Sequence, residues 1–259
     1  MTAAVEVTQL VKCYRGAAVN AVDGISFEVA SGEFCCLLGP NGAGKTTTIS
    51  ILTTTLEPTS GCVRVARRDV RTDQAGVRRN IGVVFQQPAL DQNLSAEENL
   101  RLHAMLYGLC PWRPLYRMMP ASYRSDVQEA AGILGVADLL GKPVRLMSGG
   151  QRRRLEIVRA LLHRPAVLFL DEPSAGLDPE SRRSLWAHLN RLRAQTGTTI
   201  LLTTHYLEEA EAADLACVIV AGRIVDRGSP ADLRRRHRAR SLEDAYLSLV
   251  GREQPCVPE

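Results

Sequence analysis

The sequence predicts an α/β fold in which strands of buried type alternate with helical segments. Residues 34–38 form a short apolar run, and residues 39–46 read G-x-x-x-x-G-K-[ST]. Residues 47–52 can open a helix directly afterwards. A strand, a glycine-rich loop and a helix in this order are typical of a phosphate-binding loop. Half-buried strands flank this core near the N-terminus, and a largely helical stretch, roughly 88–153, interrupts it.

The chemistry of the loop follows from its residue types. Glycines let the backbone wrap closely round an anion, and the following helix adds partial positive charge at its N-terminus. Lys45 is expected to reach the β- and γ-phosphates of ATP, and the Thr46 hydroxyl to coordinate Mg²⁺. The alternative, a turn that binds nothing, is disfavoured by the flanking strand and helix. The residues expected to hold the nucleotide here are Gly39, Asn41, Gly42, Gly44, Lys45, Thr46 and Thr47.

Alternating apolar residues predict further strands around the loop. Residues 5–11, 25–29 and 62–65 alternate with polar positions, which is typical of strands with one face buried. Residues 81–85 form another apolar strand, which ends at Gln86-Gln87-Pro88 because proline stops the ladder. We therefore expect antiparallel strands beside a nucleotide-binding core.

The middle of the chain is predicted to be helical. Residues 95–108 begin with a serine N-cap and acidic residues, and residues 126–140 return to helical spacing. His103 is interpreted as a packed or surface histidine, because no second ligand is near. Between them, Cys110 to Ser122 holds Trp112, Met118 and Met119 among three prolines. This segment is either an irregular connection packed on the helices or an apolar contact surface for another protein.

Composition argues against several classes of protein. Hydrophobic residues make up 45% and charged residues 23%, as in ordinary globular proteins, and the net charge of +4 is too small to indicate nucleic acid. Seven cysteines without C-x-x-C spacing indicate reduced cytosolic thiols. No apolar run is long enough for a membrane helix, and the N-terminus lacks signal-peptide features. We expect a cytoplasmic protein, held at the membrane only through a partner.

A second glycine-rich helix start follows the helical stretch. Ser148 is a suitable N-cap, and Gly149 and Gly150 free the backbone for close approach before Gln151. One triphosphate needs only one such site in a chain, so the second predicts a phosphate shared across a dimer. The basic run after Gln151 is interpreted as a solvated helix face.

Acidic residues close the next predicted strand. Residues 166–170 are apolar, and Asp171 and Glu172 follow at the strand end, where a phosphate-loop ATPase places its metal-linked carboxylate. Glu172 can then polarise the attacking water. A turn follows at residues 174–179, and the β-branched run 199–204 ends at His205, which can orient the water. The alternative is that Asp171 and Glu172 are solvated acids without a function.

Taken in order, these motifs resemble the ATP-binding cassette (ABC) ATPases, the motor subunits of ABC transporters, over nearly the whole chain. The resemblance implies a P-loop NTPase core with an N-terminal antiparallel β subdomain and an inserted α-helical subdomain. It implies that Tyr14 stacks on adenine and that Gln86 contacts Mg²⁺ and water. It also implies that Glu172 is the catalytic base and His205 the switch histidine. Residues implied to contact ATP elsewhere are Ser148, Gly149, Gly150, Gln151 and Asp178; those implied at the metal are Thr46, Gln86 and Asp171.

Finer runs resemble the branch typified by daunorubicin-resistance ATPases. These runs are 84–91, 152–156, 204–211 and 241–249. The resemblance implies export of drugs or other amphipathic small molecules, with a separate transmembrane permease and a homodimer through the ATP sites. Cys110–Ser122 departs from the short polar linker expected there, and the chain ends soon after the last run, which leaves no room for an added regulatory domain.

The expected organisation is one cassette domain, 1–228, with a helical tail at 229–259. Three alternatives stay open: an importer ATPase, a module that binds ATP without hydrolysis, and a cassette ATPase acting on ribosomes or nucleic acid. Only the basic run 233–240 favours the last alternative. Such a run is usually a solvated face or a membrane-surface contact, so no nucleic acid is expected.

Overall fold

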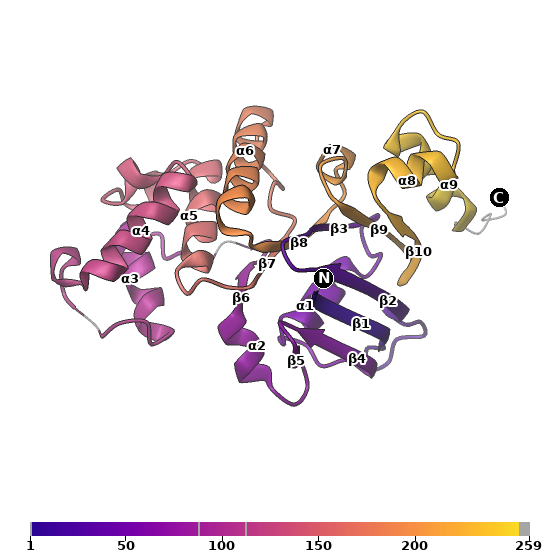
Figure 1. Ribbon diagram of the computed structural model, residues 1–259, viewed down its shortest axis with the longest axis horizontal. Coiled ribbons are helices and arrows are strands. Elements are labelled where there is room, and N and C mark those ends of the chain that lie inside the picture. The colour runs from indigo at the N-terminus through magenta and orange to yellow at the C-terminus, as the bar shows by residue number, and fades with distance from the viewer. Residues whose placement is uncertain (1, 88, 112, 254–259) are drawn as a thin grey trace. The chain divides into compact units, whose positions relative to one another are not determined.

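The computed structural model describes residues 2–87, 89–111 and 113–253, and these divide into two compact units (Figure 1). The first unit comprises residues 1–78 and 199–259, and the second comprises residues 79–198. The predicted α/β class is confirmed, because strands and helices alternate along the chain. The boundaries predicted at residue 228 and for the inserted lobe stay predictions.

An antiparallel sheet forms the N-terminal part of the first unit. Its order is β2-β1-β4-β5, and the long strands pair in registers such as Val7 with Phe27. Apolar positions alternate into the core at Ile25, Phe27 and Val29 on β2, as the period of two predicts, whereas on β1 the register shifts between Val7 and Leu10. The bounds are β1 Ala3–Lys12, β2 Val22–Ala30, β4 Ser60–Val65 and β5 Arg68–Asp69.

A mixed sheet forms the rest of the first unit. β3 lies between β8 and β9 and runs parallel to both, while β10 pairs antiparallel with β9. Every residue of β3 and β8 is buried, which explains their unbroken apolar or β-branched runs. The bounds are β3 Phe34–Leu38, β8 Thr199–Thr204, β9 Leu215–Val220 and β10 Arg223–Gly228.

Helices complete the first unit. α1 begins at the end of the glycine-rich loop, and α8 and α9, yellow in Figure 1, pack on each other and against β10 and β9. The bounds are α1 Lys45–Leu52, α7 Leu207–Ala210, α8 Pro230–Arg236 and α9 Leu242–Glu253. α2, Gln74–Asn80, leads into the second unit.

The second unit pairs two parallel strands with a group of helices. β6 and β7 are parallel, with Ile81 opposite Val167, and α5 packs against β6. α3 and α4 both contact α5. The bounds are β6 Ile81–Val84, α3 Ala96–Leu106, η1 Tyr116–Met118, α4 Ala121–Ile133, η2 Ala137–Leu139, η3 Val144–Leu146, α5 Gly149–Leu161, β7 Val167–Asp171 and α6 Pro179–Thr196.

Local signals explain where these helices begin and end. Ser95 caps α3 through a complete capping box with Glu98, as the sequence predicts. α4 begins at Ala121, earlier than the predicted start at residue 126, and ends at Ile133. It ends there because Gly135 takes φ 63°, a left-handed conformation that stops a helix. Within the part of the chain that is described, no helix combines the length and apolarity needed to cross a bilayer.

Candidate functional site

The predicted site residues fall into two sets, one in each unit, and each set has its own geometry. The first set surrounds the loop between β3 and α1. Gly42 and Gly44 take φ 79° and 102°, conformations open mainly to glycine. A Cβ at Gly39 would lie 2.2 Å from the Ile219 carbonyl oxygen, so a side chain is excluded there too. The loop has the backbone shape that the G-x-x-x-x-G-K-[ST] pattern predicts.

Lys45 lies at the first position of α1 and is only 5% exposed. Its Nζ donates to the Gly39 carbonyl at 2.7 Å and to the Pro40 carbonyl at 3.0 Å, so the ammonium group lies over the loop. Thr46, next along the helix, is exposed. A cation folded over the loop and a hydroxyl-bearing residue at the surface of α1 suit a phosphate and its metal ion.

Tyr14 lies beside this loop. Its ring is 45% exposed, and its hydroxyl is 3.3 Å from the Thr47 Oγ1 on the first turn of α1. The Lys12 Nζ lies 5.5 Å from the ring centroid. An exposed ring next to the phosphate loop suits base stacking, which is the role that the sequence predicts for it.

His205 follows the buried strand β8 and is exposed, as the sequence predicts for the strand end. Its ring lies 4.1 Å, centroid to centroid, from the ring of Tyr206. The ring therefore lies outside the core, where a bound group can reach it.

The second set gathers where β7 ends. Asp171 is the last residue of the strand and is 2% exposed, whereas Glu172 is half-buried. Glu172 takes φ 45°, a left-handed conformation that costs a non-glycine residue about 1–2 kcal/mol. Gln86 lies on the loop after β6, and its Nε2 donates to the Glu172 Oε2 at 3.4 Å. The structure thus brings together the predicted base and the predicted loop glutamine.

Ser148 caps α5 at the second glycine-rich start. Its Oγ accepts from the Gln151 N–H at 3.2 Å, and the Gln151 Oε1 accepts from the Ser148 N–H at 3.0 Å. Ser148 and Gly149 are exposed, and a Cβ at Gly150 would lie 2.9 Å from the Ser181 Oγ. The glycine at position 150 therefore has a packing reason, while Ser148 and Gly149 present an open surface.

Asp178 caps α6. Its Oδ1 accepts from the N–H groups of Glu180 and Ser181 at 3.1 and 2.9 Å. Hydrogen bonds from the Ser181 side chain and backbone hold the pKa of Asp178 below its usual value. Its predicted contact with nucleotide stays a prediction, and the helix cap accounts for the residue type.

A hollow of about 200 Å³ in the second unit is lined by both the Glu172 turn and the start of α5. It is lined by residues from the loop after β6, the end of β7, the following turn and the start of α5. Among them are Gln86, Gly149, Glu172, Gly176 and Leu177. The hollow places the predicted base and the first turn of α5 around one space.

Each residue type expected at the metal suits Mg²⁺. Thr46 offers a hydroxyl, Asp171 a carboxylate and Gln86 an amide oxygen, all hard ligands. Among the residues that are described, no group of three or more His, Cys, Asp or Glu side chains could hold a metal ion. Mg²⁺ is usually held by one or two carboxylates together with the phosphates of its substrate, so such a cluster is not needed.

The sequence interpretation missed the burial of Arg153. The run 152–154 is predicted to be a solvated helix face, but Arg153 is 7% exposed and pairs with the buried Glu156. Burial lowers the pKa of Arg153, and the carboxylate of Glu156 opposes that shift. The available signal is the i,i+3 spacing of the two charges on α5.

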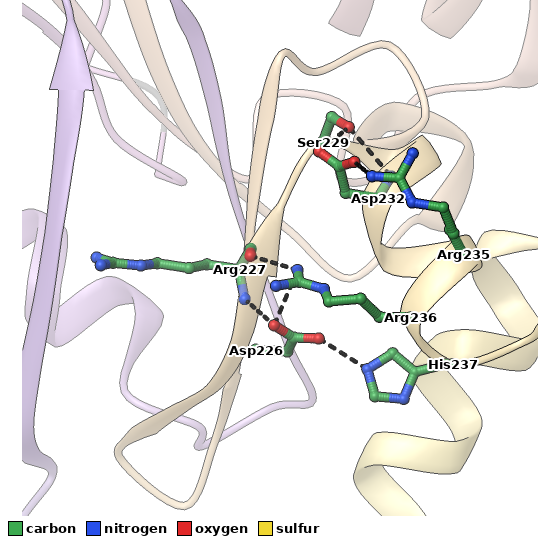
Figure 2. A network of polar contacts seen from close by, with 7 residues as sticks. All are labelled: Asp226, Arg227, Ser229, Asp232, Arg235, Arg236 and His237. Atoms are coloured by element: carbon green, nitrogen blue, oxygen red, sulfur yellow. Dashed lines mark hydrogen bonds and ion pairs between the residues drawn. The ribbon is translucent and has the colours of Figure 1, made fainter.

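Several residues of the basic run 233–240 pair with acidic residues, while Arg235, Arg236, Arg238 and Arg240 remain exposed. Arg236 and His237 both contact the Asp226 carboxylate, at 3.0 and 2.7 Å (Figure 2). Arg235 pairs with Asp232, and Arg234 pairs with Glu211. These pairs tie α8 to β10 and α7.

The segment from Cys110 to Ser122 is partly packed on the helices and partly exposed, so each of its two interpretations, a packed connection and a contact surface, has some support. Met119 is buried at 3% exposure, but Leu115 and Met118 are 46% and 51% exposed. Trp112 lies outside the described residues. A charged residue at Met119 would be forced into the core, so among the described large apolar residues of this segment Leu115 and Met118 are the exposed candidates for surface contact.

His103 is half-buried, as the packed alternative requires. Its ring lies 4.3 Å from the ring of Tyr107, which in turn stacks on His163 at 4.7 Å. Burial, together with Arg159 and His163, lowers the pKa of His103 to about 3. Burial lowers the pKa of His163 as well. Both imidazoles are therefore neutral in the folded protein at neutral pH.

A protein-family model described as ABC transporter matches residues 22–175. The chain is 41% identical over 234 residues to the daunorubicin/doxorubicin resistance ATP-binding protein DrrA of Streptomyces peucetius, covering 90% of this chain and 67% of that protein. It is 41% identical over 218 residues to the Nod factor export ATP-binding protein I of Ralstonia nicotianae, covering 83% of this chain and 64% of that protein. The chain thus spans about two thirds of the length of these relatives.

Solved structures agree with the fold. An ATP-binding subunit of an ABC transporter matches with a TM-score of 0.79 at 31% identity, covering 95% of this chain and 98% of that one. A dimeric ATP-binding cassette bound to ADP and Pi, in a post-hydrolysis state, matches with a TM-score of 0.74 at 25% identity, covering 87% of this chain and 98% of that one. The chain therefore belongs to the ABC transporter family, as an ATP-binding subunit that hydrolyses ATP.

Proposed function

We propose that the chain drives an exporter of drugs or other amphipathic small molecules, with a separate transmembrane permease as its partner. The observation that carries this proposal is the 41% identity to the Streptomyces resistance protein over 90% of the chain. The Ralstonia relative is also described as an export protein. The cargo itself need not touch this chain, because transport requires only that ATP-driven motion reaches the permease.

ATP binding is assigned to the loop in the first unit. The backbone N–H groups of residues 39–44 and the start of α1 hold the phosphates. Lys45 exchanges its contacts with the loop carbonyls for the β- and γ-phosphates, and Tyr14 stacks on the base. Thr46, Asp171 and Gln86 would hold Mg²⁺, which when bound neutralises charge on the phosphates and the leaving group.

Hydrolysis is assigned to Glu172. Its carboxylate accepts the proton of the attacking water, and the Gln86 amide, 3.4 Å away, orients that carboxylate and the water. The left-handed backbone of Glu172 holds its side chain away from the direction that the strand would otherwise give it. His205 donates to the γ-phosphate oxygen on which charge develops.

A second copy of the chain completes each site. Ser148, Gly149 and Gly150 contact ATP held by the loop of the other copy, in a head-to-tail homodimer. Charge-assisted hydrogen bonds to the phosphates then favour the closed dimer, and hydrolysis removes them. The exposed Ser148 and Gly149 support this assignment, because an open helix start can meet a ligand held elsewhere.

The experiment is export from inside-out vesicles that contain the chain and the membrane protein encoded beside it. Doxorubicin is the probe, because its fluorescence reports accumulation. We expect ATP-dependent uptake into the vesicles, lost in Lys45→Ala, which should bind ATP about 10- to 100-fold more weakly. ATP hydrolysis without any movement of doxorubicin would contradict drug export, and unchanged ATP binding in Lys45→Ala would contradict the loop assignment.

A further inference from the structure

A buried ion pair on α5 connects two loops of the candidate site. The Arg153 Nη1 lies 3.1 Å from the Glu156 Oε2, and the two residues are 7% and 2% exposed. Two buried charges are tolerated only when their remaining groups are also hydrogen-bonded. Here those groups contact backbone, and the backbone belongs to the loops that carry Glu172 and Gln86.

The guanidinium first holds the turn that carries Glu172. Nη2 donates to the carbonyls of Asp171 and Glu172 at 2.8 and 3.2 Å, and Nε donates to the Pro173 carbonyl at 2.9 Å. Three successive carbonyls thus meet one planar group. The middle residue has the left-handed φ of 45°, a conformation that persists only when its surroundings enforce it.

The same pair holds both ends of the Gln86 loop. The Arg153 Nη1 donates to the Phe85 carbonyl at 2.5 Å, on the residue before Gln86. The Glu156 Oε1 accepts from the Ala89 N–H at 2.7 Å, at the other end of the loop. One ion pair therefore sets the separation between the loop glutamine and the predicted base.

We propose that Arg153 and Glu156 are positioning residues for ATP hydrolysis, which rests on the function proposed above. α5 begins at Ser148, so its exposed first turn and Arg153 belong to one rigid helix. Five residues of helix place them about 7.5 Å apart along the axis. When the first turn of α5 binds ATP held by the other copy, α5 moves as a rigid helix. This movement shifts the Glu172 turn and the Gln86 loop. Each site thereby senses whether the opposite site is filled.

Only arginine can make this set of contacts. Its fork presents five N–H donors in one plane, whereas lysine has a single ammonium group on a flexible stem. Arg153→Lys keeps the charge opposite Glu156 but cannot reach three carbonyls and the Phe85 oxygen together. The expected result is a turnover rate about 10- to 100-fold lower with ATP affinity within about twofold of wild type, because misplacement of about 1 Å at a reacting group has this effect.

A second variant separates positioning from structural support. In Arg153→Met with Glu156→Leu, both charges are removed together and the volume is retained, so no unpaired charge is left buried. We expect this variant to fold, with an unfolding temperature below that of wild type because the carbonyls of residues 85 and 171–173 and the Ala89 N–H lose their partners, and to turn over slowly. If the pair only supported the fold, this variant, once folded, should turn over ATP at the wild-type rate.

The matched control is Arg154→Lys, on the same helix. Its guanidinium donates to the Gly150 and Leu134 carbonyls, which belong to neither loop, so turnover should be unchanged. Fluorescent ATP-analogue titration and single-turnover hydrolysis give affinity and rate separately. Wild-type turnover in Arg153→Lys or in the folded double variant would overturn the inference, as would a rate loss matched by an equal loss of affinity.

Glu172→Gln distinguishes failure of this inference from failure of the proposed function. If Glu172→Gln loses turnover while the Arg153 variants keep it, only the positioning inference fails. If Glu172→Gln hydrolyses ATP normally, the base assignment fails, and the inference fails with it.

Discussion

The two helix starts expected to meet phosphate, at α1 and at α5, are capped in opposite ways. Gly44 precedes α1 with φ 102° and contributes no side-chain cap. Ser148 precedes α5 and forms a closed capping box with Gln151. An uncapped helix start leaves backbone N–H groups for a ligand, whereas a capping box satisfies two of those groups within the chain.

This difference in capping suggests two roles: the α1 start as the binding site for phosphate and the α5 start as a surface that contacts it from another copy. The α1 start lies in a loop that a lysine covers, and it is shaped to enclose phosphate. The α5 start is complete as a helix end, and its Ser148 and Gly149 are exposed. Substitutions at α1 should therefore change ATP affinity in a single chain. Substitutions at α5 should change what happens after ATP has bound.

The largest expected effect comes from Glu172→Gln, which keeps both helix starts and removes the proton acceptor. Turnover should fall about 10²- to 10⁴-fold, because general base catalysis contributes that much. ATP should still bind, and ATP-bound dimers should accumulate in size-exclusion chromatography. Normal turnover would contradict the role of Glu172.

Ser148→Ala tests the α5 start, and Ser95→Ala is its matched control. Both serines cap a helix of the second unit through a capping box, with Gln151 and Glu98 as partners. Each alanine variant should lose about 1 kcal/mol of the free energy of unfolding, since the cap is removed.

Only Ser148→Ala should also lose turnover, by about 10-fold, because it alone loses a charge-assisted contact with phosphate. Urea unfolding and steady-state hydrolysis measure the two effects. Equal turnover in the two variants would reduce Ser148 to a structural cap.

The smallest expected effect is on the pH dependence of stability, and it belongs to the second unit. In the folded protein the pKa of His103 is about 3, below its unfolded value, so acid protonates the unfolded chain first. Stability is therefore fully present above about pH 6.5 and falls as the pH drops toward 3.

His103→Phe should weaken the dependence of stability on pH, because a phenyl ring has no group that binds a proton. Urea midpoints at pH 7.5 and 5.5 provide the measurement. The same slope in the variant would assign the acid sensitivity to other groups.

Sequence reasoning worked where the signal is local. The run Phe34–Leu38, the capping box at Ser95 and the acidic strand end at Asp171 are each encoded within a few residues, and all lie where they are predicted. It failed where distant segments decide the outcome. Arg153 lies in a basic run that is typical of a solvated face, and only the carbonyls of residues 85 and 171–173 make its burial favourable.

The ion pairs of the basic run near the C-terminus could not be predicted for the same reason. The partners of Arg236 and His237 lie on Asp226, and that of Arg234 on Glu211, outside the helix that carries the run. Spacing within one helix cannot reveal such pairs. α2 was also missed, because the short segment from Gln74 to Asn80 has little apolar periodicity.

The central claim is that each ATP is shared between the α1 loop of one copy and the α5 start of another. Two variants test it together: Lys45→Ala disables the loop, and Gly149→Asp places a negative charge at the α5 start. A Cβ at Gly149 has room, and an acidic residue suits the first turn of a helix, so the second variant should fold.

Each variant alone should hydrolyse ATP very slowly. An equal mixture should regain up to about a quarter of the wild-type rate, because half of the dimers are mixed, each mixed dimer contains one intact composite site, and its opposite site stays empty. A mixture that forms mixed dimers but hydrolyses no faster than the two variants measured separately would contradict the shared site.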